Sequence, residues 1–178
     1  MSISALLKAV RNTLRAEMDL EDATCRIMPG PKPPPSCGQR FFSVYAADWV
    51  AGDYDLNLGL DESYGIAVAL TFRAGFAPYD DHGEELYIQN LESMENMIRN
   101  MIVLLDKSID IMTQANNFIT GTYKIIEPLR FESVDAYPRY VDESWFLAQT
   151  TQSDPYCGLV QQLNLSGARR KQVTGSAE

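Results

Sequence analysis

The feature that most constrains how this chain can fold is an alternation of large and small side chains between Glu62 and Ala74. One face of this stretch would carry Tyr64, Ile66, Val68, Leu70 and Phe72, and the other would carry Gly65, Ala67, Ala69, Thr71 and Arg73. A period of two predicts a β-strand, and small residues on the second face indicate that both faces are packed. At about 3.3 Å per residue this strand would be roughly 43 Å long, longer than most strands. We therefore expect a β-hairpin arm over residues 62–78 that projects beyond the core and pairs across subunits.

Two stretches have the 3.6-residue period of amphipathic helices, residues 3–18 and 90–117. The apolar stripe of the first consists of Ile3, Leu7, Val10, Leu14 and Met18, and that of the second of Leu91, Met94, Ile98, Met101, Leu105, Ile109 and Met112. Methionine fills irregular gaps in cores well, so we interpret this second stripe as a core face and not as a ligand groove. We expect one short and one long helix that pack against the sheet.

Further strands are predicted at residues 39–47, at 129–133, at Ser144–Thr151 and at 159–165, because these stretches return to a period of two. The acidic stretch 48–61 is rich in turn residues. The five prolines of residues 29–38 exclude a helix or a central strand and predict a connecting loop, which in an assembling subunit could also reach toward a neighbour.

The predicted order of elements is α-β-β-α-β-β, which is typical of an α+β fold with a mostly antiparallel sheet packed against one long and one short helix. We expect a single domain over residues 1–168, which includes the proline-rich loop and the hairpin arm, followed by a basic and polar tail over residues 169–178.

Charge and cysteine usage exclude several classes of protein. The chain of 178 residues carries a formal net charge of −9, so it lacks the excess of basic residues with which proteins wrap nucleic acid. No apolar stretch is long enough to span a bilayer and no secretion signal is present at the N-terminus, so we expect no membrane partner. The odd set of Cys25, Cys37 and Cys157 predicts reduced thiols in a cytoplasmic setting, and the spacing of the first two fits no zinc motif.

The best candidate for chemistry is the acidic stretch that holds the only histidine, Asp80-Asp81-His82. Carboxylates and an imidazole could hold a divalent ion, so a metal-dependent hydrolase is one alternative; a solvated charged link explains the same residues. No nucleophile motif and no phosphate-binding glycine loop is present. We therefore expect no catalytic, cofactor-binding or metal residue and a protein that is not an enzyme; a small binding or adaptor module outside any virus is a further alternative.

The end of the chain, residues 158–170 with the sequence GLVQQLNLSGARR, joins a strand to small residues and then to arginines. Together with the short N-terminal helix, the proline-bearing loop, two strands, one long helix and paired C-terminal strands, it resembles the tail terminators of tailed bacteriophages. The resemblance implies a virion structural protein, assembled in the host cytoplasm, that forms a ring, usually of six subunits, and joins the tail tube to the head connector. A head–tail connector or adaptor subunit of the neck is the alternative within this class.

For a ring subunit we expect neighbouring copies to contact the large face of the long strand and the basic end of the chain. The interface candidates are Tyr64, Ile66, Val68, Leu70, Phe72, Phe76, Arg169 and Arg170. Genomic DNA would pass through such a ring without tight binding, because acidic walls repel phosphates over about 8 Å at physiological salt.

Overall fold

The computed structural model describes residues 2–32, 34, 39–55, 59–74, 81–120, 122–134, 139–141 and 157–171. Within these ranges the elements follow one another as α1 (Ser2–Glu17), β1 (Cys25–Ile27), β2 (Arg40–Asp55), β3 (Gly59–Ala74), α2 (Asp81–Leu105), α3 (Ile109–Phe118), β4 (Tyr123–Ile125), β5 (Arg130–Val134), β6 (Arg139–Val141) and β7 (Cys157–Lys171). The α+β class is confirmed. The expected α-β-β-α-β-β order is not, because the chain adds three short strands and a third helix.

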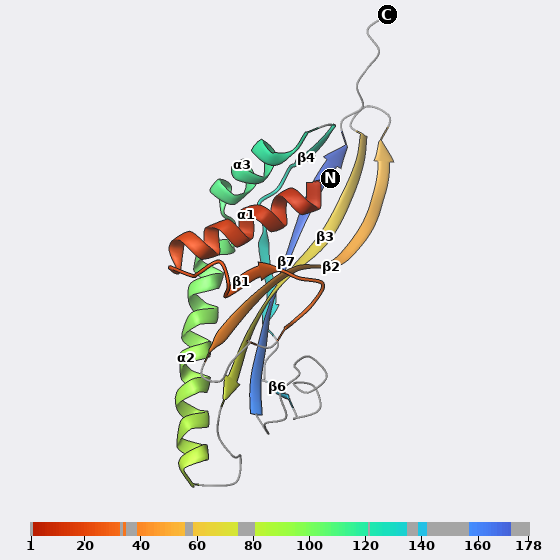
Figure 1. Ribbon diagram of the computed structural model, residues 1–178. Helices are drawn as coiled ribbons and strands as arrows, with labels where there is room; N and C mark the ends of the chain where they lie inside the picture. The colour runs from red at the N-terminus through yellow and green to blue at the C-terminus, as the bar shows by residue number, and fades with distance from the viewer. Residues whose placement is uncertain are drawn as a thin grey trace, which may run out of the picture.

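One mixed sheet organises the molecule (Figure 1). Its strand order is β1-β2-β3-β7-β4, and β5 and β6 also pair with β7. Only β1 and β2 run parallel among the described pairings. The short strands β4, β5 and β6 lie one after another along the outer side of β7, opposite its residues 169–171, 163–166 and 158–160. The sheet therefore has three long strands and one interrupted edge.

The hairpin is longer than expected, and its two strands join between Asp55 and Gly59 and not within residues 62–78. Residues 48–61 do not form the predicted turn-rich stretch, because β2 continues to Asp55 and β3 already begins at Gly59. Pairing with β3 overrides the local preference of the aspartates and glycines for turns, and two bulges, between Ala46 and Asp48 and between Ala51 and Tyr54, absorb the extra residues. The stretch 62–74, which we expected to be the arm, is most of β3, the second strand of a hairpin over residues 40–74 whose strands join between Asp55 and Gly59; residues 75–78 lie outside the described part of the chain.

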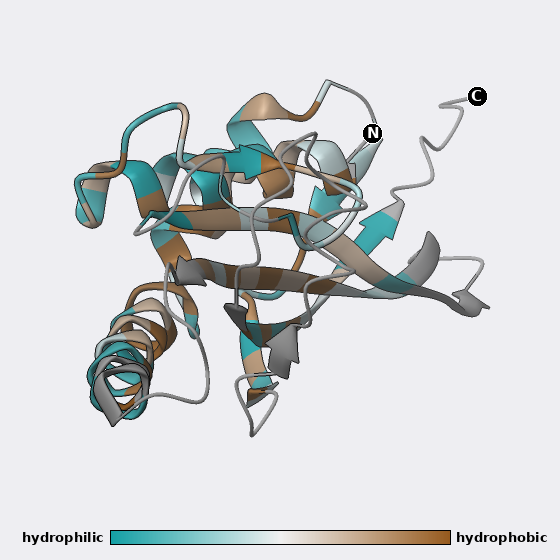
Figure 2. Ribbon diagram, turned by 60° about the horizontal axis from the view of Figure 1, so that its bottom comes forward, coloured by the Kyte–Doolittle hydropathy of each residue, from teal (hydrophilic) through white to brown (hydrophobic). Residues whose placement is uncertain are grey.

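The main core lies between the helices and one face of the sheet (Figure 2). The first helix buries the predicted stripe, with Val10 and Leu14 fully enclosed, and α2 buries Met94, Met101 and Leu105. The strands meet them with Phe42, Val44, Tyr64, Ile66, Val68, Leu70, Phe72, Leu163 and Leu165. The predicted packing of the two helical stripes on the long strand is therefore confirmed up to Leu105.

The prediction of one helix over residues 90–117 was wrong. The second helix begins earlier, at Asp81, and ends at Leu105; Lys107 then takes a left-handed conformation, with φ of 54°. The Ser108 side chain caps the new helix α3 by accepting a hydrogen bond from the Ile111 amide. This break shifts the buried face, so that Ile111 and Ala115 enter the core while Ile109 is 57% exposed.

The second face of the sheet is also covered, as the small residues predicted. Ala67 and Ala69 are fully buried beneath Tyr45. The proline-rich loop crosses this face: the Lys32 amide donates to Ser43 Oγ at 3.1 Å, and Thr71 Oγ1 donates to the Lys32 carbonyl. The described part of this loop therefore packs on the chain's own sheet.

Candidate assembly surface

The outer side of β2 is paired along only part of its length by the strands that the structure describes. Strand β1 pairs with Phe42, Ser43 and Val44, and the Met28 amide donates to the Val44 carbonyl at 3.0 Å. From Ala46 to Asp55, no strand in the described part of the chain pairs with the outer side of β2. Figure 1 shows this part of β2 curving away on the side of the sheet remote from β4.

On the opposite edge, β4 and β5 are capped by residues of α3 and of the corner between α2 and α3. The Asn116 amide group donates to the Ile125 carbonyl at 3.1 Å and accepts from the Ile125 N–H at 2.9 Å. Asp106 Oδ1 accepts the Phe131 N–H at 2.8 Å, and the Lys107 N–H donates to the Leu129 carbonyl at 2.6 Å. Side chains and turns thus take the hydrogen-bonding positions that another strand would need.

Strand β1 is capped in the same manner. The Arg15 guanidinium donates from Nε to the Cys25 carbonyl at 2.9 Å and forms an ion pair with Asp22 at 2.7 Å. Burial raises the pKa of the Cys25 thiol to about 11, against the weaker opposing effect of Arg15. Cys25 is therefore a neutral core residue and not a reactive thiol.

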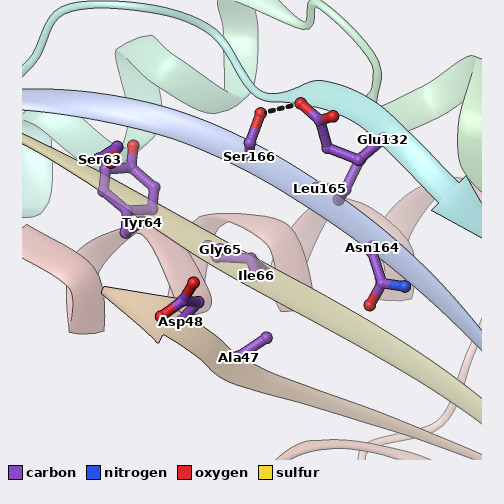
Figure 3. Close-up of a pocket in the computed structure, with 10 residues that line it drawn as sticks. All are labelled: Ala47, Asp48, Ser63, Tyr64, Gly65, Ile66, Glu132, Asn164, Leu165 and Ser166. Atoms are coloured by element: carbon purple, nitrogen blue, oxygen red, sulfur yellow. Dashed lines mark hydrogen bonds between the residues drawn. The ribbon is translucent and has the colours of Figure 1, made fainter. Parts of the chain in front are cut away.

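A hollow of about 330 Å³ lies at the base of the arm, on the face away from the helices (Figure 3). Its charged lining residues are Asp48 and Glu132, and its other lining residues are Ala47, Ser63, Tyr64, Gly65, Ile66, Asn164, Leu165 and Ser166. Ser166 donates a hydrogen bond to Glu132. The bulge brings the backbone nitrogen and Cβ of Asp48 within 3.3 Å of where a side chain on Gly65 would begin, so glycine permits this close approach of β2 and β3.

A buried ion pair ties the root of the arm to β7. Glu62 and Arg169 are register partners, their side chains are 4% and 11% exposed, and they form a short salt bridge. The Arg169 guanidinium also lies over the Tyr123 ring, 4.8 Å from its centre. Beside them, Tyr64 packs so closely on Gly167 that a Cβ there would lie 2.8 Å from its hydroxyl, and burial raises the pKa of Tyr64.

Most of the predicted interface residues serve the subunit itself. The side chains of Tyr64, Ile66, Val68, Leu70 and Phe72 are at most 6% exposed and face the chain's own helices, so they are not the surface that a neighbour meets. Arg169 and Arg170 do not belong to a tail, since β7 extends to Lys171, and Arg169 is paired with Glu62. Phe76 lies outside the described residues.

The residues considered for chemistry do not form a described site. Asp81 and His82 lie in the first turn of α2, and Asp80 lies outside the described residues. Among the residues that the structure describes, no group of three or more His, Cys, Asp or Glu side chains could hold a metal ion. None of the described helices combines the length and the apolar character needed to cross a membrane.

No protein-family model matches the chain, and no curated protein matches it either.

Proposed function

We propose that the protein is a structural subunit of a tailed-phage particle, a tail terminator that forms a ring, caps the tail tube and joins it to the head connector. A head–tail connector or adaptor subunit of the neck is the alternative position in the same assembly. The observation that supports an assembly role is the outer side of β2 from Ala46 to Asp55, which pairs with no strand that the structure describes, in a sheet whose short strands β1, β4 and β5 are capped by side chains. The place in a virion rests on the resemblance of the sequence to tail terminators.

An open strand edge favours assembly for a physical reason. Unpaired amides and carbonyls on a long edge form a template for another strand, and soluble proteins usually protect such edges. This chain protects β1, β4 and β5 with Arg15, Asn116 and Asp106. An edge that is left open beside three capped ones fits a surface reserved for a partner. A head-to-tail contact of this kind generates a closed ring when the rotation between copies is right.

The deciding experiment is negative-stain electron microscopy of the purified chain, alone and mixed with tail tubes, together with light scattering after size-exclusion chromatography. We expect rings, either free or seated on tube ends. Particles that stay single both alone and in contact with tubes would overturn the proposal.

The ring should not hold DNA tightly. Sequence-independent affinity for duplex DNA comes from basic side chains that displace counterions, and this chain has 15 basic against 24 acidic residues. At physiological salt we expect a Kd for duplex DNA weaker than about 1 μM, measured by fluorescence anisotropy with a labelled duplex. Submicromolar affinity would contradict passage of DNA without binding.

A further inference from the structure

We propose that the hollow where α1, α2 and α3 meet receives Lys124 of a second copy of this chain, with the lysine ammonium beside Glu17 and Asp110. This contact rests on the proposed function, assembly into a ring, and names the two surfaces through which neighbouring copies meet. It does not involve the outer side of β2.

The hollow has a volume of about 500 Å³ and lies between the second half of α1, the end of α2 and the first turns of α3. A water molecule takes up about 30 Å³ of the liquid, so a long side chain together with several waters fits in this volume. Apart from Val103 and Leu104, its described lining residues are polar or small. The hollow is therefore large enough to hold a side chain of a neighbour.

The charged groups in the lining are carboxylates. Glu17 at the end of α1 and Asp110 in the first turn of α3 both line the hollow, and none of its described lining residues is basic. Arg11 of α1 lies outside the lining and donates from Nη2 to Asn12 Oδ1 at 2.9 Å. Two carboxylates in one concave site favour a cationic group there, because opposite charges across a contact attract and reject partners of the wrong sign.

Two further features of the wall fit a lysine side chain. Thr13 Oγ1 is buried and has no hydrogen-bond partner among the described residues. A buried hydroxyl without a partner is unfavourable, and an N–H donor that enters the hollow can supply that partner. Val103 is 81% exposed, although valine is usually buried, and apolar surface of this kind packs against the methylene stem of a lysine. The wall thus offers acceptors for an ammonium group and a contact for its stem.

Lys124 of β4 is an exposed cation at the end of the sheet. Its register partner on β7 is Arg170, whose register partner on β3 is Asp61. Like charges opposite each other on neighbouring strands repel, and this row of two cations and one anion has one positive charge in excess. Ile126, two residues further on, is also exposed and provides apolar surface to meet Val103. The end of β4 therefore complements the hollow in charge and in apolar surface.

The two surfaces belong to different parts of the subunit. Lys124 is not among the described residues that line the hollow of its own chain. Figure 1 shows β4 beside the end of β7 at the upper end of the sheet, whereas α1 ends on the left beside α2. A contact between two different surfaces joins copies head to tail, and such contacts close into a ring when the rotation between copies is right. Insertion of Lys124 into the hollow is therefore compatible with a ring of equivalently oriented subunits.

The test is charge reversal in the full chain, with sedimentation velocity over a concentration series as the measure of self-association. Glu17→Lys reverses the charge in the hollow, and it changes the last residue of α1, where a cation is favourable for the helix. Lys124→Glu reverses the charge on the other surface. We expect each variant to lower the association constant at least about tenfold, because like charges brought together at a contact are strongly unfavourable.

Matched controls make the same changes of charge elsewhere. Glu92→Lys and Lys8→Glu alter exposed residues outside the hollow and outside β4, and both should associate as the wild type does. Equal losses in these controls would show that only net charge matters and would overturn the site. Asp110→Asn removes a carboxylate without adding a cation and should weaken association in the same direction as Glu17→Lys. Circular dichroism and thermal unfolding establish that each variant is folded.

An equimolar mixture of Glu17→Lys and Lys124→Glu tests whether the two surfaces meet each other. In alternating order, Lys124 of the first variant meets the unchanged Glu17 of the second, and the two substituted positions meet with opposite charges. Association should therefore return close to the wild-type level, although each variant alone is impaired. A mixture that associates no better than its components would overturn the pairing of these surfaces.

Wild-type association of Glu17→Lys would overturn the hollow as the receptor, and wild-type association of Lys124→Glu would overturn Lys124 as the inserted residue. Between about 0.1 M and about 1 M salt the Debye length falls from about 10 Å to about 3 Å, so association that ignores this change would overturn a contact made by charge. A wild-type chain that stays monomeric up to its solubility limit would overturn the contact between copies. Rings on tail tubes would still uphold the proposed function in each of these cases, whereas their absence would overturn that function independently.

Discussion

The two edges of the sheet differ in what binds their outward backbone amides and carbonyls. Along β4 and β5, the corner between α2 and α3 supplies Asn116, Asp106 and the Lys107 amide to the outward groups of the strands. Along β2 beyond Val44, no described strand takes that role. Among the described residues, the caps therefore lie on the short strands, and the long strand β2 has none beyond Val44 that the structure describes.

The largest expected loss of stability concerns the buried ion pair between Glu62 of β3 and Arg169 of β7. Glu62→Ala leaves the Arg169 guanidinium buried without its partner, and breaking one half of a buried ion pair costs about 3–5 kcal/mol. Urea unfolding should show this loss. Glu132→Ala, which removes an exposed carboxylate at the capped edge, is the matched control and should cost less than about 1 kcal/mol. If both variants lost the same free energy of unfolding, the ion pair between Glu62 and Arg169 would not stabilise the contact of β3 with β7.

A smaller effect is expected at the capped edge itself. Asn116→Ala removes both hydrogen bonds to Ile125, whose side chain is buried, and should lower the free energy of unfolding by about 2 kcal/mol. The exposed neighbour Asn117 provides the control, since Asn117→Ala removes a side chain of the same size and chemistry. Equilibrium urea unfolding of both variants measures the difference. If Asn116→Ala were as stable as Asn117→Ala, the cap would not hold the edge.

The smallest expected effect is a pH dependence of stability that arises from Cys25 in β1. The pKa of Cys25 is raised to about 11 by burial, so the folded state holds this proton more tightly than the unfolded state does. The contribution of Cys25 to stability is therefore fully present below the unfolded pKa of about 9. It falls as pH rises through the window from about 9 to about 11, by at most about 1.4 kcal/mol per pH unit.

Alkylation tests the burial of the same thiol. At pH 8 iodoacetamide should modify Cys25 at least about a hundredfold more slowly in the folded than in the unfolded chain, because its side chain is fully buried and its thiolate fraction is lower by about that factor. Peptide mapping by mass spectrometry quantifies the product, and urea-unfolded protein is the control. Rapid labelling in the folded state would mean that the β1 end of the edge opens readily.

The sequence predicted those parts of the fold in which one local pattern persists. The stripes of α1 and α2, the alternation from Tyr64 to Phe72 and the final strand each repeat one period over many residues, and burial follows these patterns. The three-residue strands β1, β4 and β6 were missed because a stretch so short shows no period. They are strands only because a long neighbour, β2 or β7, offers them hydrogen bonds.

The errors at the candidate surface have a related cause. The turn-rich composition of residues 48–61 pointed to a loop, but cross-strand pairing with β3 extends the hairpin through it. The apolar face of β3 pointed to a subunit contact, but α1 and α2 cover it within the chain. A pattern of side chains tells which face is apolar and does not tell which element covers it.

The amino-acid sequence by itself determined the class of this protein: its acidity, the amphipathic helices and a long strand packed on both faces. Only the tertiary structure decided which sheet edges are capped, because Asn116, Asp106 and Arg15 look like ordinary polar residues until folding brings them to Ile125, Phe131 and Cys25. Hydrogen bonds between backbone and distant side chains leave no periodic trace in a sequence. The outer side of β2 beyond Val44, on which the proposed assembly depends, is distinguished only in the folded chain, as the stretch that pairs with no described strand.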